Sequence, residues 1–176
     1  MFKIIALIVV LALAGVLGYA ATRPDTFSVQ RSLAIKAPPE KIFPLIENFH
    51  RWSEWSPYEK LDPQMKRSYT GPDSGPGAAY AWDGDSKAGA GSMEILRTTV
   101  PGSVVIKLDF IRPITGHNAA TFTLESSGGT TTVTWTMAGP APYISKLMGL
   151  FFNMDQMIGK GFETGLDNLK RIAEQQ

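Results

Sequence analysis

Cysteine is absent from the 176 residues, so the chain has neither a disulfide framework nor a thiol nucleophile. Histidine is scarce, because His50 and His117 are the only two and lie far apart. Without cysteine and without a close pair of histidine and carboxylate, we expect no metal site and no cofactor. The formal net charge is +1 and no block of like charge occurs, so the sequence lacks the basic footprint of a nucleic-acid-binding protein.

The longest apolar run lies at the N-terminus. Residues Ile4 to Ala21 carry no charge, and the next charged residue is Arg23. At a rise of about 1.5 Å per residue, a helix of this length crosses a hydrocarbon core of about 30 Å. We therefore assign residues 1–22 to a transmembrane anchor or signal segment, residues 23–26 to a linker and residues 27–176 to one globular domain.

Two interpretations of the apolar run stay open. Lys3 and the small residues on both sides of Tyr19 fit a signal peptide with its cleavage site. The run is longer than a usual signal core and reaches Tyr19 without a polar break, which favours an uncleaved single-pass anchor. Lys3 then favours a cytoplasmic N-terminus, although Arg23 weakens that bias. The domain would be extracytoplasmic, periplasmic in a Gram-negative host, and secreted if the segment is cleaved.

Strand-like and helical patterns follow one another in the rest of the chain. Residues 27–36 alternate with Phe27, Val29, Leu33 and Ile35 on one face, which predicts a half-buried strand. A short helix opens after Pro38, because proline is accepted in a first helical turn. Six further strand-like segments follow, separated by glycine and proline clusters: 65–69, 78–83, 89–99, 103–110, 118–124 and 130–138.

Residues 142–174 change to a helical period. One apolar stripe runs through Ile144, Leu147, Met148, Phe151, Ile158, Phe162, Leu166, Leu169 and Ala173. Consecutive strands usually pair with each other, and an antiparallel sheet with one apolar face can bury that face against one long helix. We therefore predict an α+β fold in which the sheet curls around the C-terminal helix.

Several segments resemble the SRPBCC superfamily, and more narrowly its START-like, polyketide cyclase/dehydrase-like branch. They are APPEKIF (37–43), WSEWSP (52–57), GPDSGPGAAYAWDG (71–84), VTW (133–135) and GKGFETGLDNLK (159–170). This resemblance implies a helix-grip fold, with a seven-stranded antiparallel sheet around a long C-terminal helix. It also implies an apolar cavity between helix and sheet for lipids, polyketides or other hydrophobic compounds.

Strand alternation selects the side chains that face this helix. On the last strand Val133, Trp135 and Met137 share one face, and we expect this apolar set to point inward. Such a face is either plain core packing or the wall of a ligand cavity, and methionines suit an adaptable cavity. The candidate ligand-binding residues are Trp55, Trp82, Met93, Ile106, Leu108, Asn118, Phe122, Trp135, Met137, Met148, Phe151 and Asp155.

Two charged residues occupy positions where apolar ones are expected. Asp155 lies on the helical stripe, and Arg31 shares the inward parity of the first strand. A buried charge needs a partner, so we predict an ion pair between Arg31 and Asp155. The alternative is that one of the two side chains reaches solvent at the rim of the sheet. Trp52 and Trp55, three residues apart, form either a plug that closes the core or a gate of the cavity.

The sequence supports three functions. The first is an extracytoplasmic, membrane-anchored domain that binds a hydrophobic small molecule or lipid. The second is an enzyme of the cyclase/dehydrase type, for which we find no convincing catalytic residue, since the parity of His117 and Asp109 points outward. The third is an envelope interaction protein with a closed core. Polar residues converging in a cavity favour the second, an apolar cavity the first, and no cavity the third.

Overall fold

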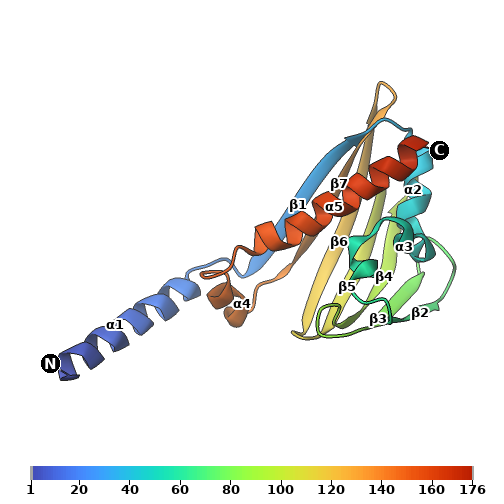
Figure 1. The fold of residues 1–176 in the computed structure, drawn as a ribbon. Coiled ribbons are helices and arrows are strands. Elements are labelled where there is room, and N and C mark those ends of the chain that lie inside the picture. The colour runs from blue at the N-terminus through green and yellow to red at the C-terminus, as the bar shows by residue number, and fades with distance from the viewer. Residues whose placement is uncertain (1, 176) are drawn as a thin grey trace.

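The structure is a computed structural model that describes residues 2–175, and its elements follow the predicted order (Figure 1). The helices are α1 (Phe2–Ala21), α2 (Pro39–Glu47), α3 (Trp52–Trp55), α4 (Tyr143–Met148) and α5 (Met154–Gln175), with short 3-10 helices η1 (Phe49–Arg51) and η2 (Pro57–Lys60). The strands are β1 (Thr26–Ile35), β2 (Lys66–Thr70), β3 (Ala79–Asp83), β4 (Ala90–Thr99), β5 (Ser103–Arg112), β6 (Gly116–Ser127) and β7 (Thr130–Pro140).

The seven strands form one antiparallel sheet in the order β1-β7-β6-β5-β4-β3-β2. Consecutive strands from β2 to β7 pair with one another, and the first strand, β1, pairs with the last, β7, where Val29 lies opposite Met137. The sheet curls around α5, which crosses its concave face (Figure 1). The predicted α+β helix-grip fold is therefore confirmed.

The core lies between the concave face of the sheet and the apolar stripe of α5. Val133, Trp135 and Met137 are buried as their parity predicted, and the intervening threonines are half-buried on the other face. The ring of Trp135 stacks on Phe162 of α5 with ring centroids 4.1 Å apart. This stacked pair joins the middle of β7, the strand next to the edge of the sheet, to α5.

Residues 39–60 close one end of the core. The apolar face of α2 is buried, and each tryptophan of α3 donates its indole N–H to a carbonyl of α2. Trp52 reaches Ile46 O and Trp55 reaches Leu45 O, both at 2.9 Å. Of the two interpretations of this pair, the plug fits its burial and its hydrogen bonds.

The C-terminal helical region is broken where the sequence predicted a continuous period. Helix α4 ends at Met148, a turn covers residues 149–153, and α5 begins at Met154. Gly149 is a poor helix former, and the side chain of Asn153 caps α5 by accepting from the backbone N–H of Gln156 at 3.0 Å. Because of this break, Phe151 lies in an exposed turn rather than on the buried stripe.

Helix α1 extends away from the domain (Figure 1). Among residues 2–175 it is the one helix that is long and apolar enough to cross a membrane, by length and composition. Its C-terminal end meets α4, where the hydroxyl of Tyr143 donates to Leu17 O at 2.9 Å. Next to this contact, Lys146 Nζ lies 2.5 Å from the carboxylate of Asp25 in the linker. Two side chains of α4 thus hold the domain against the end of α1.

Candidate ligand cavity

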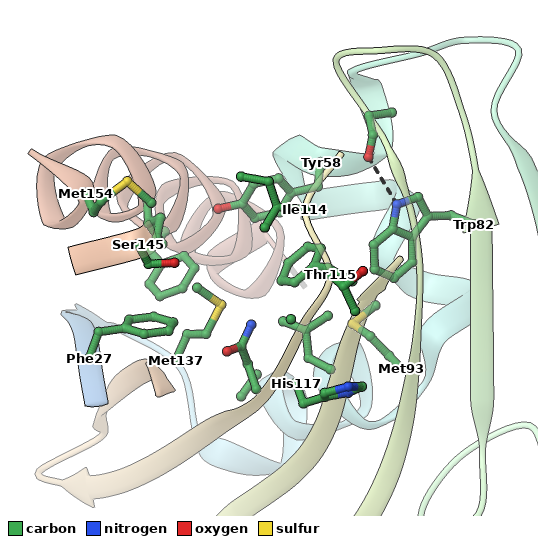
Figure 2. Close-up of a pocket in the computed structure, with 18 of the residues that line it drawn as sticks. Phe27, Tyr58, Trp82, Met93, Ile114, Thr115, His117, Met137, Ser145 and Met154 are labelled. Atoms are coloured by element: carbon green, nitrogen blue, oxygen red, sulfur yellow. Dashed lines mark hydrogen bonds between the residues drawn. The ribbon is translucent and has the colours of Figure 1, made fainter. Parts of the chain in front are cut away.

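A cavity of about 690 Å³ lies between the concave face of the sheet and the layer formed by η2, α4 and α5. Its wall is mainly aliphatic, aromatic and methionine side chains. Figure 2 shows Phe27 and Met137 from the sheet facing Ser145 of α4 and Met154 of α5 across this space. Helix α5 packs mainly on β1, and its Phe162 stacks on Trp135 of β7, while α2 contacts β5 and β6. The curl of the sheet leaves the cavity beside α5.

The cavity has a closed end and an open mouth, which differ in how exposed their wall residues are. The wall residues Trp52, Trp135 and Phe162 are buried and form the closed end beside the core. Ile114 in the turn between β5 and β6 and Met154 at the start of α5 are exposed and form the mouth. The mouth is therefore at the end of the domain that carries α4 and α1 (Figure 1).

Seven of the twelve candidate residues lie on the cavity wall: Trp82, Met93, Leu108, Asn118, Trp135, Met137 and Met148. Trp82 is held in place by its indole N–H, which donates to Ala88 O at 3.1 Å (Figure 2). Six of the seven come from strands, where period-two alternation directs the side chain toward the concave face. Contact of these residues with a ligand stays a prediction.

Three candidates lie in the packed core instead of on the cavity wall. Trp55, Ile106 and Phe122 are fully buried. Ile106 has the same inward parity as Leu108, but it lies further from the mouth, where the sheet is already filled. Parity correctly predicts which face of the sheet a side chain lies on. It does not predict the position along the strand at which the packed core ends and the cavity begins.

The remaining two candidates lie outside the cavity. Phe151 is 70% exposed because the break between α4 and α5 removes it from the buried stripe. Asp155, in the first turn of α5, binds Arg31 of β1 with Oδ2 2.9 Å from Nη2, which confirms the predicted ion pair. Arg31 has a second partner that the sequence analysis missed, since its Nε lies 2.7 Å from Glu163 Oε1.

Arg31, Asp155 and Glu163 form a cluster of ion pairs that links the edge strand β1 to α5. The hydrogen bond from Arg31 holds the pKa of Asp155 below its usual value. Hydrogen bonds from Asp155 and then Glu163 raise the pKa of Arg31 further above its usual range. Both carboxylates are more than half exposed, so Asp155 forms the predicted pair and also reaches solvent at the rim of the sheet. The cluster therefore tethers the start of α5 to β1 without burying a carboxylate.

Sequence reasoning missed a buried polar cluster on the cavity wall. Tyr80 donates its hydroxyl to Glu59 Oε1 at 2.6 Å, and Arg67 donates Nε to Glu59 Oε2 at 2.7 Å. Burial, and then the hydrogen bond to Glu59, raises the pKa of Tyr80 well above its usual value. Tyr58 is 38% exposed as a whole residue, but its hydroxyl lies against α5 near Gly161, and desolvation there raises its pKa to about 12. Both tyrosines are therefore protonated at neutral pH.

Each acidic side chain on the wall has a partner, and so does the wall histidine. Asp25 binds Lys146, Glu59 binds Arg67, and His117 at the rim has Nδ1 2.8 Å from Asp109 Oδ1. Across residues 2–175, the wall includes no lysine or arginine. No group of three or more His, Asp and Glu side chains in this part of the chain is placed to hold a metal ion.

A long helix gripped by a curled seven-stranded sheet, with an apolar cavity between them, defines the class of helix-grip proteins. The sequence model of the family described as polyketide cyclase / dehydrase and lipid transport matches residues 26–174. The chain belongs to this family, in agreement with the SRPBCC-type resemblance of its motifs.

Solved structures share the fold at low sequence identity. Protein CV1439 from Chromobacterium violaceum has 15% identity and a TM-score of 0.59, covering 86% of this chain and 99% of its own. Ara h 8.0201 has 12% identity and a TM-score of 0.57 over the same shares of the two chains. DynU16, from the dynemicin biosynthetic locus, has 16% identity and a TM-score of 0.56, covering 85% of this chain and 47% of its own. No curated protein matches the chain.

Proposed function

We propose that this protein binds a neutral apolar small molecule or lipid in the cavity between α5 and the sheet. The cavity carries the proposal, because its volume of about 690 Å³ lies within the usual range of small-molecule sites. Burial of apolar surface is worth about 25 cal/mol per Å², so a wall of this chemistry favours acyl chains and ring systems over sugars or nucleotides.

The charges around the cavity support a neutral ligand. The two wall carboxylates, of Asp25 and Glu59, are already paired with Lys146 and Arg67. A fatty acid or phosphate ester inside would therefore bring a negative charge without a cation to receive it, which is costly at a largely apolar wall. Asn118 and Tyr58 on the wall provide uncharged groups for a hydroxyl or carbonyl.

We further propose that α1 anchors the domain in a membrane, with the domain on the extracytoplasmic side. Apart from Ala20, which is buried, helix α1 leaves its apolar side chains exposed, as a lipid-facing helix does. The family description includes lipid transport, which suits a cavity whose mouth is beside such an anchor. The signal-peptide interpretation predicts the same domain in a secreted form.

The two alternatives receive less support from the geometry. A cyclase needs an acid or base at the wall that is free to act on a substrate. Both carboxylate oxygens of Glu59 are engaged by Tyr80 and Arg67. A closed-core interaction protein does not need a cavity of about 690 Å³.

The direct test is native mass spectrometry of the full chain extracted in detergent, followed by titration with a fluorescent fatty alcohol. We expect a co-purifying apolar mass and saturable binding of the probe. Ala120→Phe, on the wall and buried, should fill part of the cavity and weaken binding by about tenfold or more, equivalent to about 1.4 kcal/mol.

Ala119→Phe is the matched control, because Ala119 is the neighbouring residue on β6 and faces away from the cavity. Its affinity for the probe should remain that of the parent chain. Equal affinity of both variants, with the fold intact by circular dichroism, would exclude the cavity as the binding site. Absence of any saturable binding would exclude the proposed function.

A further inference from the structure

One segment of the domain surface is unusually apolar. Within residues 143–157, six large apolar side chains are exposed: Tyr143, Ile144, Phe151, Phe152, Met154 and Met157. The far longer remainder of the domain exposes the same number, scattered from Tyr58 to Ile114. We call these six side chains the α4 surface. Concentrated exposure of this kind marks a surface that binds another apolar surface.

The α4 surface is continuous with the lipid-facing surface of α1. The Tyr143 hydroxyl binds Leu17 O at 2.9 Å, so α4 lies against the last turn of α1 (Figure 1). Leu17 lies four residues before the end of α1 at Ala21, which corresponds to about 6 Å along the helix. Helices that lie in a membrane interface bury their apolar face by about 5–10 Å. The depth set by this contact therefore matches an interfacial position of α4.

The charges in this segment do not oppose contact with lipid. Lys146 and Asp155 are its two ionisable side chains with a charge at neutral pH. Lys146 is bound to Asp25 at 2.5 Å and Asp155 to Arg31 at 2.9 Å. Pairing lowers the cost of bringing these groups near a medium of low dielectric constant.

The same segment also walls the cavity. Ser145 and Met148 of α4 and Met154 of α5 line it near the mouth, and Figure 2 shows Ser145 and Met154 on the side opposite Phe27 and Met137. The segment thus borders the cavity on one side and carries the α4 surface on the other, and Met154 belongs to both.

We propose that the α4 surface seats on the lipid bilayer beside α1 and forms the portal through which an apolar ligand passes between the membrane and the cavity. The seating rests on the proposed membrane anchoring, and the portal rests in addition on the proposed ligand binding. The partner is the interfacial layer of the bilayer that holds α1, so no second protein is needed.

The absence of cysteine allows a direct test in the full chain. Phe151→Cys and Val100→Cys, each labelled with the fluorophore NBD, are matched sites with 70% and 71% exposure of the native residue. Val100 follows β4, at the end of the strands opposite the mouth. In phosphatidylcholine liposomes, we expect the label at 151 to be quenched by nitroxide-bearing lipid and protected from iodide. The label at position 100 should be quenched by iodide and should not be quenched by the nitroxide-bearing lipid. Equal iodide quenching at both positions overturns the proposed seating of the α4 surface on the bilayer.

A second measurement tests the portal. Phe151→Asp combined with Phe152→Asp should slow transfer of a pyrene-labelled fatty alcohol from phosphatidylcholine vesicles to the protein by about tenfold, equivalent to about 1.4 kcal/mol. Binding of the same probe added from solution should not change, and Val100→Asp should alter neither quantity. An unchanged transfer rate overturns the portal.

The two measurements separate this inference from the proposed function. A parent chain that does not bind the probe overturns the portal together with the proposed ligand binding. The quenching measurement at position 151 still decides the seating in that case, because it requires no ligand. A chain that binds the probe but leaves position 151 in water keeps the proposed ligand binding and overturns the seating.

Discussion

The guanidinium of Arg31 on β1 lies 2.9 Å from the carboxylate of Asp155 in the first turn of α5, and it reaches that carboxylate across Gly159. A Cβ atom at residue 159 would overlap the Arg31 guanidinium. The absence of a side chain at Gly159 is therefore what lets the edge strand and the helix approach each other beside the cavity mouth.

Gly159→Ala should destabilise the fold although alanine is the better helix former. The new methyl group displaces Arg31 and breaks its contacts with Asp155 and Glu163. In an Arg31→Met background the same change should be less harmful or stabilising, by up to about 1 kcal/mol from helix propensity. Urea unfolding of the four chains in detergent micelles gives the double-mutant cycle. An identical effect of Gly159→Ala in both backgrounds would contradict this account.

The Arg31–Asp155 pair should also make stability depend on pH on the acid side. The pKa of Asp155 is lowered in the folded state, so its contribution is present above its unfolded value of about 3.9. That contribution is lost as the pH falls through the lower folded value. Arg31→Met should reduce the loss of stability below about pH 4 relative to the parent chain. Asp155→Asn should reduce it similarly, and an unchanged pH profile in both would show that the pair contributes nothing to folding.

Trp135→Ala should be among the most destabilising single changes. Trp135 is buried and stacks on Phe162 at 4.1 Å, and its removal leaves a cavity between sheet and helix. Truncation of a buried tryptophan costs about 3–5 kcal/mol. Trp82→Ala is the control, because Trp82 is only half-buried on the cavity wall and should cost clearly less. A loss below about 1 kcal/mol for Trp135→Ala would contradict the packing described here.

Tyr58 should titrate late on the alkaline side. Its pKa is raised by burial to about 12, so its contribution to stability is present below its unfolded pKa of about 10. The contribution is lost as the pH rises from about 10 through about 12. Absorbance of tyrosinate should show one fewer late-titrating group in Tyr58→Phe, and the variant should lose less stability over this range. Titration of Tyr58 near pH 10 would mean that its hydroxyl is in water.

Alternation and helical period, read from the sequence, were sufficient for the fold and for the inward faces. They also predicted the ion pair between Arg31 and Asp155. Strand alternation puts Arg31 on the core-facing side of β1, and the helical period puts Asp155 on the core-facing stripe of α5. They did not predict the break at Gly149, since an apolar stripe continues through Phe151 whether or not the backbone does. Seven candidates reach the cavity wall, while Ile106 and Phe122 share their parity and lie beyond its closed end.

The polar part of the wall could not be predicted in this way. Glu59 lies in η2, a 3-10 helix of 4 residues that is too short to show a period. Its partners, Arg67 and Tyr80, come from β2 and β3, and only the folded sheet brings the three together. Such a cluster depends on the register of three separate elements rather than on any local pattern.

Glu59→Ala should destabilise the domain by about 1–3 kcal/mol, because it leaves the buried hydroxyl of Tyr80 without an acceptor and Arg67 without its carboxylate. Glu59→Gln retains an acceptor and should cost less. Adding Tyr80→Phe to Glu59→Ala should recover part of the loss, since the unpaired hydroxyl is then removed. Urea unfolding in detergent micelles measures all three, and fatty alcohol binding by Glu59→Gln should stay close to that of the parent chain if Glu59 supports the wall without contacting the ligand. Loss of binding in a fully stable Glu59→Gln chain would instead place this carboxylate among the ligand-binding groups.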